Sequence, residues 1–77
     1  MNKQRRKWLN DTISKIYDVV DELNSIRDEE EECYDNLPEG IQCSERGDTM
    51  QEIIDGIDTE ISSLEDVISN LNDIVEL

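Results

Sequence analysis

Two pairs of acidic residues have the types and the spacing to bind a divalent cation. Glu29 and Glu32 form an E-x-x-E pair, and Glu52 and Asp55 form an E-x-x-D pair after an interval of 19 residues. Carboxylate oxygens are the ligands that Mg²⁺ takes in proteins. If the chain folds back between the two pairs, they lie at matching heights, and the four carboxylates form a candidate metal site.

The remaining reactive residues do not form a catalytic pattern. The chain has no histidine, and neither Cys33 nor Cys43 has an evident activating base, so the sequence does not support nucleophilic catalysis. Two cysteines ten residues apart are not a zinc cluster either. We expect no cofactor and no metal. We predict a cytoplasmic protein, in which the two cysteines are expected to be reduced thiols. Because they flank the predicted turn and could approach each other, the sequence does not decide whether they form a disulfide.

The elements that would position these side chains are two long helices. From Met50 to Val75, apolar residues recur at alternating steps of four and three, which is the heptad pattern of a helix packed along one stripe. The stripe consists of Ile54, Ile61, Ile68 and Val75 at position a, Met50, Ile57, Leu64 and Leu71 at position d, and Ile53, Val67 and Ile74 at position g. A two-stranded seam needs positions a and d alone, so the wider stripe favours a bundle with more than one neighbouring helix.

A second helix is predicted over residues 3–34. Its apolar positions are Leu9, Ile13, Ile16, Val20 and Leu23 at d and a, with Val19 and Ile26 at g. Arg27 at position a and Glu30 at position d then interrupt the stripe. These two residues form an ion pair or extend to solvent at the turn end, or else they specify register and pairing, as polar core residues do in coiled coils.

The connection between the helices is predicted over residues 35–43. Pro38 biases the preceding residue away from helical geometry, and Pro-Glu-Gly is a turn signal. Leu37 and Ile41 are expected to plug the open end of the helix pair. Ser44 is a suitable N-cap for a helix over residues 44–76, and Asp48 offers a second possible start.

Two long helices joined by a short connection predict an all-α antiparallel hairpin that forms one domain over residues 1–77. Two helices alone cannot cover stripes of this width. We therefore expect the hairpin to be coiled-coil-like and to dimerise into a four-helix bundle, with the apolar residues at positions a and d as the core and dimer interface. The alternative is that a partner protein supplies the missing helices. The pattern does not fix how two hairpins are oriented.

The spacing of the paired carboxylates is similar to that of the all-α nucleotide pyrophosphatases, which hold Mg²⁺ inside a four-helix bundle. This resemblance implies a Mg²⁺-dependent hydrolase. The heptad register opposes it, because Glu29 and Glu32 fall at positions c and f, and Glu52 and Asp55 at f and b, all facing solvent. Short motifs also match by chance in a chain with 21 acids. The hydrolase is a distant alternative, and we predict a non-enzymatic protein.

The charge distribution indicates the kind of partner. The chain carries a formal net charge of −14, which argues against binding to nucleic acid or to an anionic membrane. The candidate partner-binding residues are Trp8, beside a basic N-terminal cluster, and the acids on the outer face of the second helix, Glu52, Asp55, Asp58, Glu65, Asp66 and Asp73. Regularly spaced carboxylates can imitate a nucleic-acid backbone and occupy a basic groove. Plain solvation of an acidic surface, with Trp8 covering the open end of the hairpin, is the simpler alternative.

The turn region has a family resemblance. The segment Tyr-Asp-Asn-Leu-Pro-Glu-Gly-Ile-Gln-Cys-Ser-Glu-Arg, residues 34–46, follows the acidic run 28–32. It resembles small acidic helical proteins encoded by phages and prophages of Gram-positive bacteria, although Gly47 stands where a larger residue is expected. The resemblance implies a mobile-element origin. Together with the acidic helix, it suggests an inhibitor, a DNA mimic that binds a basic host nucleic-acid enzyme or defence complex. A structural homo-oligomerisation module is the alternative.

Overall fold

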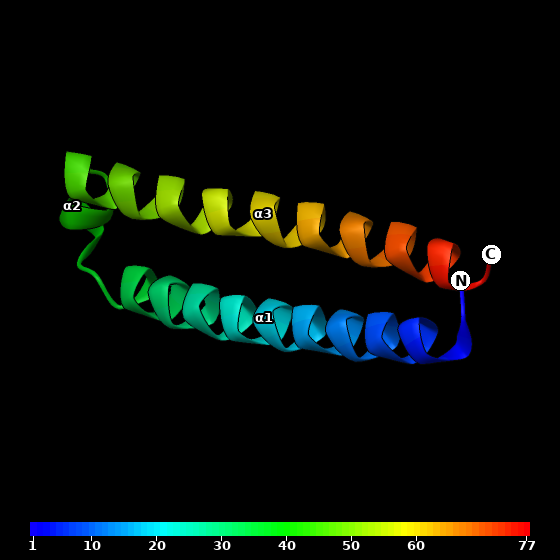
Figure 1. Cartoon of the computed structure of the whole chain (residues 1–77). Helices are drawn as coiled ribbons and strands as arrows, with labels where there is room; N and C mark the ends of the chain where they lie inside the picture. Colours follow the sequence, from blue (N-terminus) through cyan, green and yellow to red (C-terminus); the bar gives the residue numbers. More distant parts are fainter.

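Two long antiparallel helices form the molecule, and a short helical turn joins them (Figure 1). The computed structural model describes all 77 residues, with α1 at Lys3–Asp35, α2 at Glu39–Gln42 and α3 at Glu45–Val75. The termini of the chain lie close together at the end opposite α2 (Figure 1). The chain is therefore all-α and hairpin-like, and the bounds of the long helices agree with the sequence-based prediction to within a residue. The helical turn α2 inside the connection was not predicted.

The starts of the long helices are capped differently. The Asn2 side chain accepts a hydrogen bond from the backbone N–H of Arg5 at 2.8 Å, which satisfies one of the free amides at the start of α1. Ser44 occupies the N-cap position of α3 as expected, but its hydroxyl donates to the Ile41 carbonyl instead of accepting from a helix amide. Asp48 lies inside the first turn of α3, so the alternative start at that residue is wrong.

Close backbone contact at the turn depends on Gly47. This residue is buried at the start of α3, where α2 packs against it. A Cβ atom on Gly47 would overlap the Gln42 carbonyl oxygen and would lie 2.7 Å from the Ile41 carbonyl oxygen. The Gln42 side chain in turn donates a hydrogen bond of 2.9 Å to the Tyr34 carbonyl oxygen and ties α2 to the end of α1. The small residue at position 47 is therefore a packing requirement of this turn.

The core is a narrow aliphatic seam between α1 and α3. Its buried side chains all occupy position a, namely Ile13, Val20, Ile54, Ile61 and Ile68. The half-buried side chains against it are Leu9, Ile16, Leu23, Ile57, Leu64, Leu71 and Val75. The radius of gyration is 17.6 Å and the molecule measures 59 × 15 × 11 Å, whereas a compact chain of this length has a radius of about 11–12 Å. The single hairpin is a rod whose apolar stripe is incompletely covered.

Candidate protein-interaction faces

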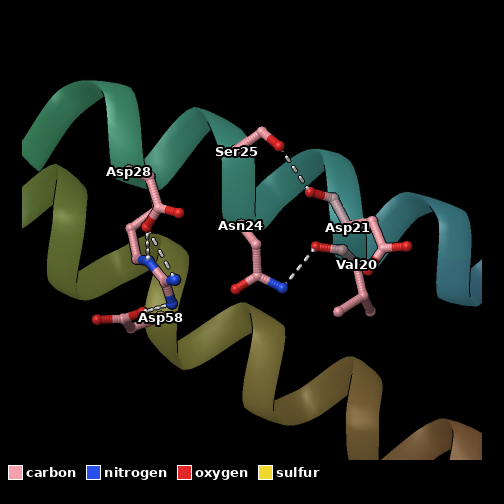
Figure 2. A network of polar contacts seen from close by, with 7 residues as sticks. Val20, Asp21, Asn24, Ser25, Asp28 and Asp58 are labelled. Carbon is pink, nitrogen blue, oxygen red and sulfur yellow. Dashed lines mark hydrogen bonds and ion pairs between the residues drawn. The ribbon is translucent and has the colours of Figure 1, made fainter.

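A single side-chain ion pair links the two long helices. Arg27 of α1 reaches across to α3 and donates to the Asp58 carboxylate at 2.6 Å, and it also contacts the adjacent Asp28 at 3.0 Å (Figure 2). The hydrogen bond to Asp58 is the main reason that the pKa of Arg27 is raised above its ordinary value, with Asp28 second. The guanidinium therefore stays charged at every pH at which the hairpin is expected to fold. This contact joins α1 and α3 at one level of the hairpin.

Local hydrogen bonds fill the rest of this region. Asn24 donates to the Val20 carbonyl at 3.0 Å and Ser25 to the Asp21 carbonyl at 3.2 Å, both within α1 (Figure 2). These bonds satisfy polar side chains without joining the helices. Glu30 is half-buried and makes no ion pair, so an ion pair between Arg27 and Glu30 is not observed. The observed partner of Arg27, at position a of α1, is Asp58 at position e of α3. A base at a and an acid at e of the facing helix could have indicated this ion pair from the sequence.

The outer side of α3 presents carboxylates that nothing in the chain neutralises. Glu52, Asp55, Glu65, Asp66 and Asp73 are all exposed. The three ion pairs of the molecule involve other acids, namely Asp11, Asp28 and Asp58. Of the six acids predicted to bind a partner, Asp58 alone is engaged within the hairpin. The remaining five form the acidic face of α3.

A row of large apolar side chains is exposed along the hairpin. It consists of Val19 and Ile26 from α1 and Ile53, Val67 and Ile74 from α3, which are between 43% and 51% exposed. All five occupy position g. In an antiparallel helix pair the g positions of both helices lie on the same side of the seam, so these residues form one apolar face. Contiguous exposed apolar side chains are a candidate contact surface.

The N-terminal end of the hairpin is basic and largely unpaired. Its four bases are Lys3, Arg5, Arg6 and Lys7. Lys7 contacts Asp11 at 3.5 Å within α1, and no ion pair reaches Asp73 or Glu76 at the end of α3. Unpaired bases at one end and a long acidic surface elsewhere give the molecule a charge polarity along its axis.

Trp8 projects from this basic end and is 70% exposed. It does little to cover the open end of the hairpin, which was one of the two roles considered from the sequence. A hollow of about 300 Å³ lies beside it, lined by Met1, Arg5, Trp8, Leu9 and Thr12. An aromatic ring next to a guanidinium is a suitable contact for an acidic, partly apolar segment of a partner.

The carboxylate pairs considered for Mg²⁺ do not converge. Glu29, Glu32, Glu52 and Asp55 are all exposed, and no three acidic or cysteine side chains come close enough to hold a metal ion. Cys33 and Cys43 are unpaired and exposed on either side of α2. No helix combines the length and the apolar character needed to cross a membrane. The features that remain as candidate sites are the acidic face, the apolar face and the basic end with Trp8.

Comparison of the chain with protein-family models, with curated proteins and with solved structures finds no match.

Proposed function

We propose that this chain is a non-enzymatic, acidic protein-binding module that presents the acidic face of α3 to a basic surface of another protein. The observation that carries the proposal is the row of exposed carboxylates at Glu52, Asp55, Glu65, Asp66 and Asp73 without an internal ion pair. Unpaired charge of one sign steers a partner of the opposite sign and raises its rate of association. The partner class that fits best is a protein whose basic groove ordinarily binds nucleic acid.

Charge density supports a nucleic-acid mimic only if two copies act together. A net charge of −14 over a length of 59 Å corresponds to about one charge per 4 Å, while duplex DNA carries one per about 1.7 Å. Two hairpins side by side present about one charge per 2 Å. The mimic that we propose is therefore a homodimer, and the resemblance of the turn segment to phage-encoded proteins is consistent with an antagonist of a host nucleic-acid enzyme.

The second candidate function is structural homo-oligomerisation without a basic partner. It is favoured by the apolar face, where Val19, Ile26, Ile53, Val67 and Ile74 remain exposed in the single hairpin. Pairing two such faces would complete a four-helix bundle. The two candidates share the dimer and differ in whether the carboxylates of α3 bind anything.

A displacement assay separates the two functions. A fluorescent duplex oligonucleotide is bound to a basic, histone-like DNA-binding protein, and the chain is titrated in while anisotropy is measured at low and at high salt. We expect displacement that weakens steeply as salt rises, since the contacts are between exposed charges. No displacement from this protein or from a panel of basic nucleases and polymerases would contradict the mimic and leave the structural module.

The matched control removes the same number of negative charges from α1 instead of from the acidic face of α3. In one variant Asp55, Asp66 and Asp73 are changed to asparagine on the acidic face, and in the other three exposed acids of α1 without an ion pair are changed, Asp18 and Asp21 to asparagine and Glu32 to glutamine. We expect the first variant to lose displacement by about tenfold or more, because each charge pair in a complementary interface contributes on the order of 1 kcal/mol, and the second to lose less. Equal losses would show that net charge acts without a defined face.

A further inference from the structure

We infer that the apolar face binds a second copy of the chain in antiparallel orientation, so that α1 packs against α1 and α3 against α3 of the other copy. The basic end of each hairpin then lies beside the acidic turn end of the other. This inference rests on the proposed dimer and goes beyond it, because it assigns the surface, the orientation and the charges that select that orientation.

The surface next to the apolar face of α3 is uncharged, so a neighbouring helix can pack closely against it. Position c lies next to position g on a helix, and α3 carries Thr49, Gly56, Ser63 and Asn70 at c, all uncharged and exposed. Every acid of α3 except Glu60 lies at positions b, e or f, on the side away from the apolar face. A partner that covers the g side of α3 therefore buries no carboxylate along most of its length, and burying unpaired charge is what would otherwise oppose the contact.

The corresponding flank of α1 is charged, and its sign changes along the helix. Arg5 at g and Lys15 at c lie in the N-terminal half, while Glu22 and Glu29 lie at c in the C-terminal half, and all four are exposed. None of them makes an ion pair within the hairpin. When two copies of α1 run in opposite directions, the basic half of each flank faces the acidic half of the other. A two-fold symmetric contact requires a surface that is complementary to itself in this way.

The orientation follows from this polarity. In the antiparallel dimer, the N-terminal half of α1 lies along the C-terminal half of the other α1, so Lys15 of each copy lies near Glu22 or Glu29 of the other. In the parallel dimer, α1 faces the uncharged flank of the other α3, and the acidic runs at residues 28–32 of both copies lie at the same end. Like charges brought together in that way repel. The antiparallel dimer gains pairs where the parallel dimer gains none.

The size of the face is adequate. A side of 59 × 15 Å matches the roughly 800 Å² per partner that a stable interface buries. Trp8 at position c lies at the edge of this face and is the single tryptophan of the chain. In the antiparallel dimer it comes beside the acidic segment around Glu29 of the second copy. Its fluorescence is therefore a direct signal of dimer formation.

The test uses the full chain and reversal of charge on the α1 flank. One variant carries Arg5→Glu with Lys15→Glu, a second carries Glu22→Lys with Glu29→Lys, and a third combines all four changes and keeps the net charge of −14. Sedimentation velocity and Trp8 fluorescence against concentration give the dimer dissociation constants, and circular dichroism checks that each variant remains helical. The half-variants carry net charges of −14 − 4 = −18 and −14 + 4 = −10, so each is compared with a variant of the same net charge that is changed at exposed positions of α3 away from the apolar face. Relative to that control we expect each half-variant to dimerise about tenfold more weakly, and the combined variant to return to within about threefold of the unmodified chain.

Recovery in the combined variant supports the inference, because a parallel dimer has no such pairs to restore. A dimer whose dissociation constant is unchanged in the half-variants, or which is not restored in the combined variant, overturns the antiparallel orientation while the proposed dimer stands. A chain that remains monomeric at every concentration overturns both and leaves the apolar face to helices of another protein. A second measurement uses Ile26→Cys with Cys33→Ser and Cys43→Ser, because residue 26 lies away from the middle of α1. In the antiparallel dimer the two thiols are separated by about 20 Å along the helix axes and a short bis-maleimide does not join them, whereas in the parallel dimer they lie at the same height and are crosslinked, which would overturn the inference.

Discussion

Gly47 and Gly56 both lie in α3, but their surroundings give them opposite roles. A Cβ atom at Gly47 meets the backbone of Ile41 and Gln42, while at Gly56 it meets nothing within 4 Å. We expect Gly47→Ala to lower the free energy of unfolding by about 1–3 kcal/mol, the usual range for overpacking. Gly56→Ala should raise it by up to about 1 kcal/mol, because alanine favours a helix. Urea denaturation followed by circular dichroism measures both, and two changes of the same sign would contradict the packing at the turn.

The ion pair between Arg27 and Asp58 is the one side-chain ion pair that joins α1 to α3. Asp58 accepts from the facing helix and Asp28 from the adjacent position. We expect double-mutant cycles with Arg27→Gln to give a larger coupling free energy for Asp58→Asn than for Asp28→Asn, because the Asp58 contact alone is lost when the helices separate. The raised pKa of Arg27 places its deprotonation above the pH range in which the protein folds, so its stabilising contribution is present throughout that range and is lost only as the pH rises through the raised pKa. The Arg27 side of the contact therefore adds no pH dependence near neutrality. Equal couplings would mean that α1 and α3 are aligned by the apolar seam alone.

At the scale of the elements, the a positions carry the folding of the hairpin. Ile61 is 4% exposed at the middle of the seam. We expect Ile61→Ala to lower the free energy of unfolding by about 2–5 kcal/mol, the range for removing a buried aliphatic side chain, and to abolish most helicity at 37 °C. Ser62→Ala, one residue further along at an exposed position, should change it by less than about 0.5 kcal/mol. Thermal unfolding of the two variants side by side measures this, and similar midpoints would contradict the assignment of the core.

The helices were predictable because their signal is periodic. Heptad spacing places Ile54, Ile61 and Ile68 on one stripe, and a stripe of that kind specifies both the helix and its buried side. The turn was harder to predict, because it depends on contacts between backbone atoms that no period reveals. Ser44 was predictable as the cap of α3, whereas α2 was not, and Gly47 looked like a departure from a larger residue although the turn leaves no room for a Cβ atom there. The heptad register correctly placed the acidic residues on the solvent side. The ion pair between Arg27 and Asp58 depends on how far α1 is shifted along α3, and the heptad pattern of each helix does not determine that shift.

At the scale of the whole molecule, a small core and a large net charge both limit the stability of the fold. A rod with only five buried apolar side chains has a small hydrophobic contribution to its stability, and a net charge of −14 opposes both folding and dimer formation by self-repulsion. Salt screens this repulsion over about 10 Å at 0.1 M and about 3 Å at 1 M. The ion pairs of the hairpin are few and short in range, so the loss of their attraction is smaller than the repulsion removed.

We therefore expect added salt to stabilise the chain while it weakens the proposed complex with a basic protein. The midpoint of thermal unfolding at neutral pH should rise from 0.01 M to 1 M NaCl, and equally with KCl, because general screening does not depend on the cation. Self-association should strengthen over the same range, although the Lys15 contacts to Glu22 or Glu29 are themselves weakened, because the repulsion between two chains of −14 each involves many more charges. Displacement of DNA from a basic protein should weaken, since that contact joins opposite charges.

An unfolding midpoint that falls with salt would instead mean that attractive pairs such as Arg27 with Asp58 outweigh the global repulsion. A rise in the midpoint seen only with divalent cations would indicate that the carboxylates bind a metal ion.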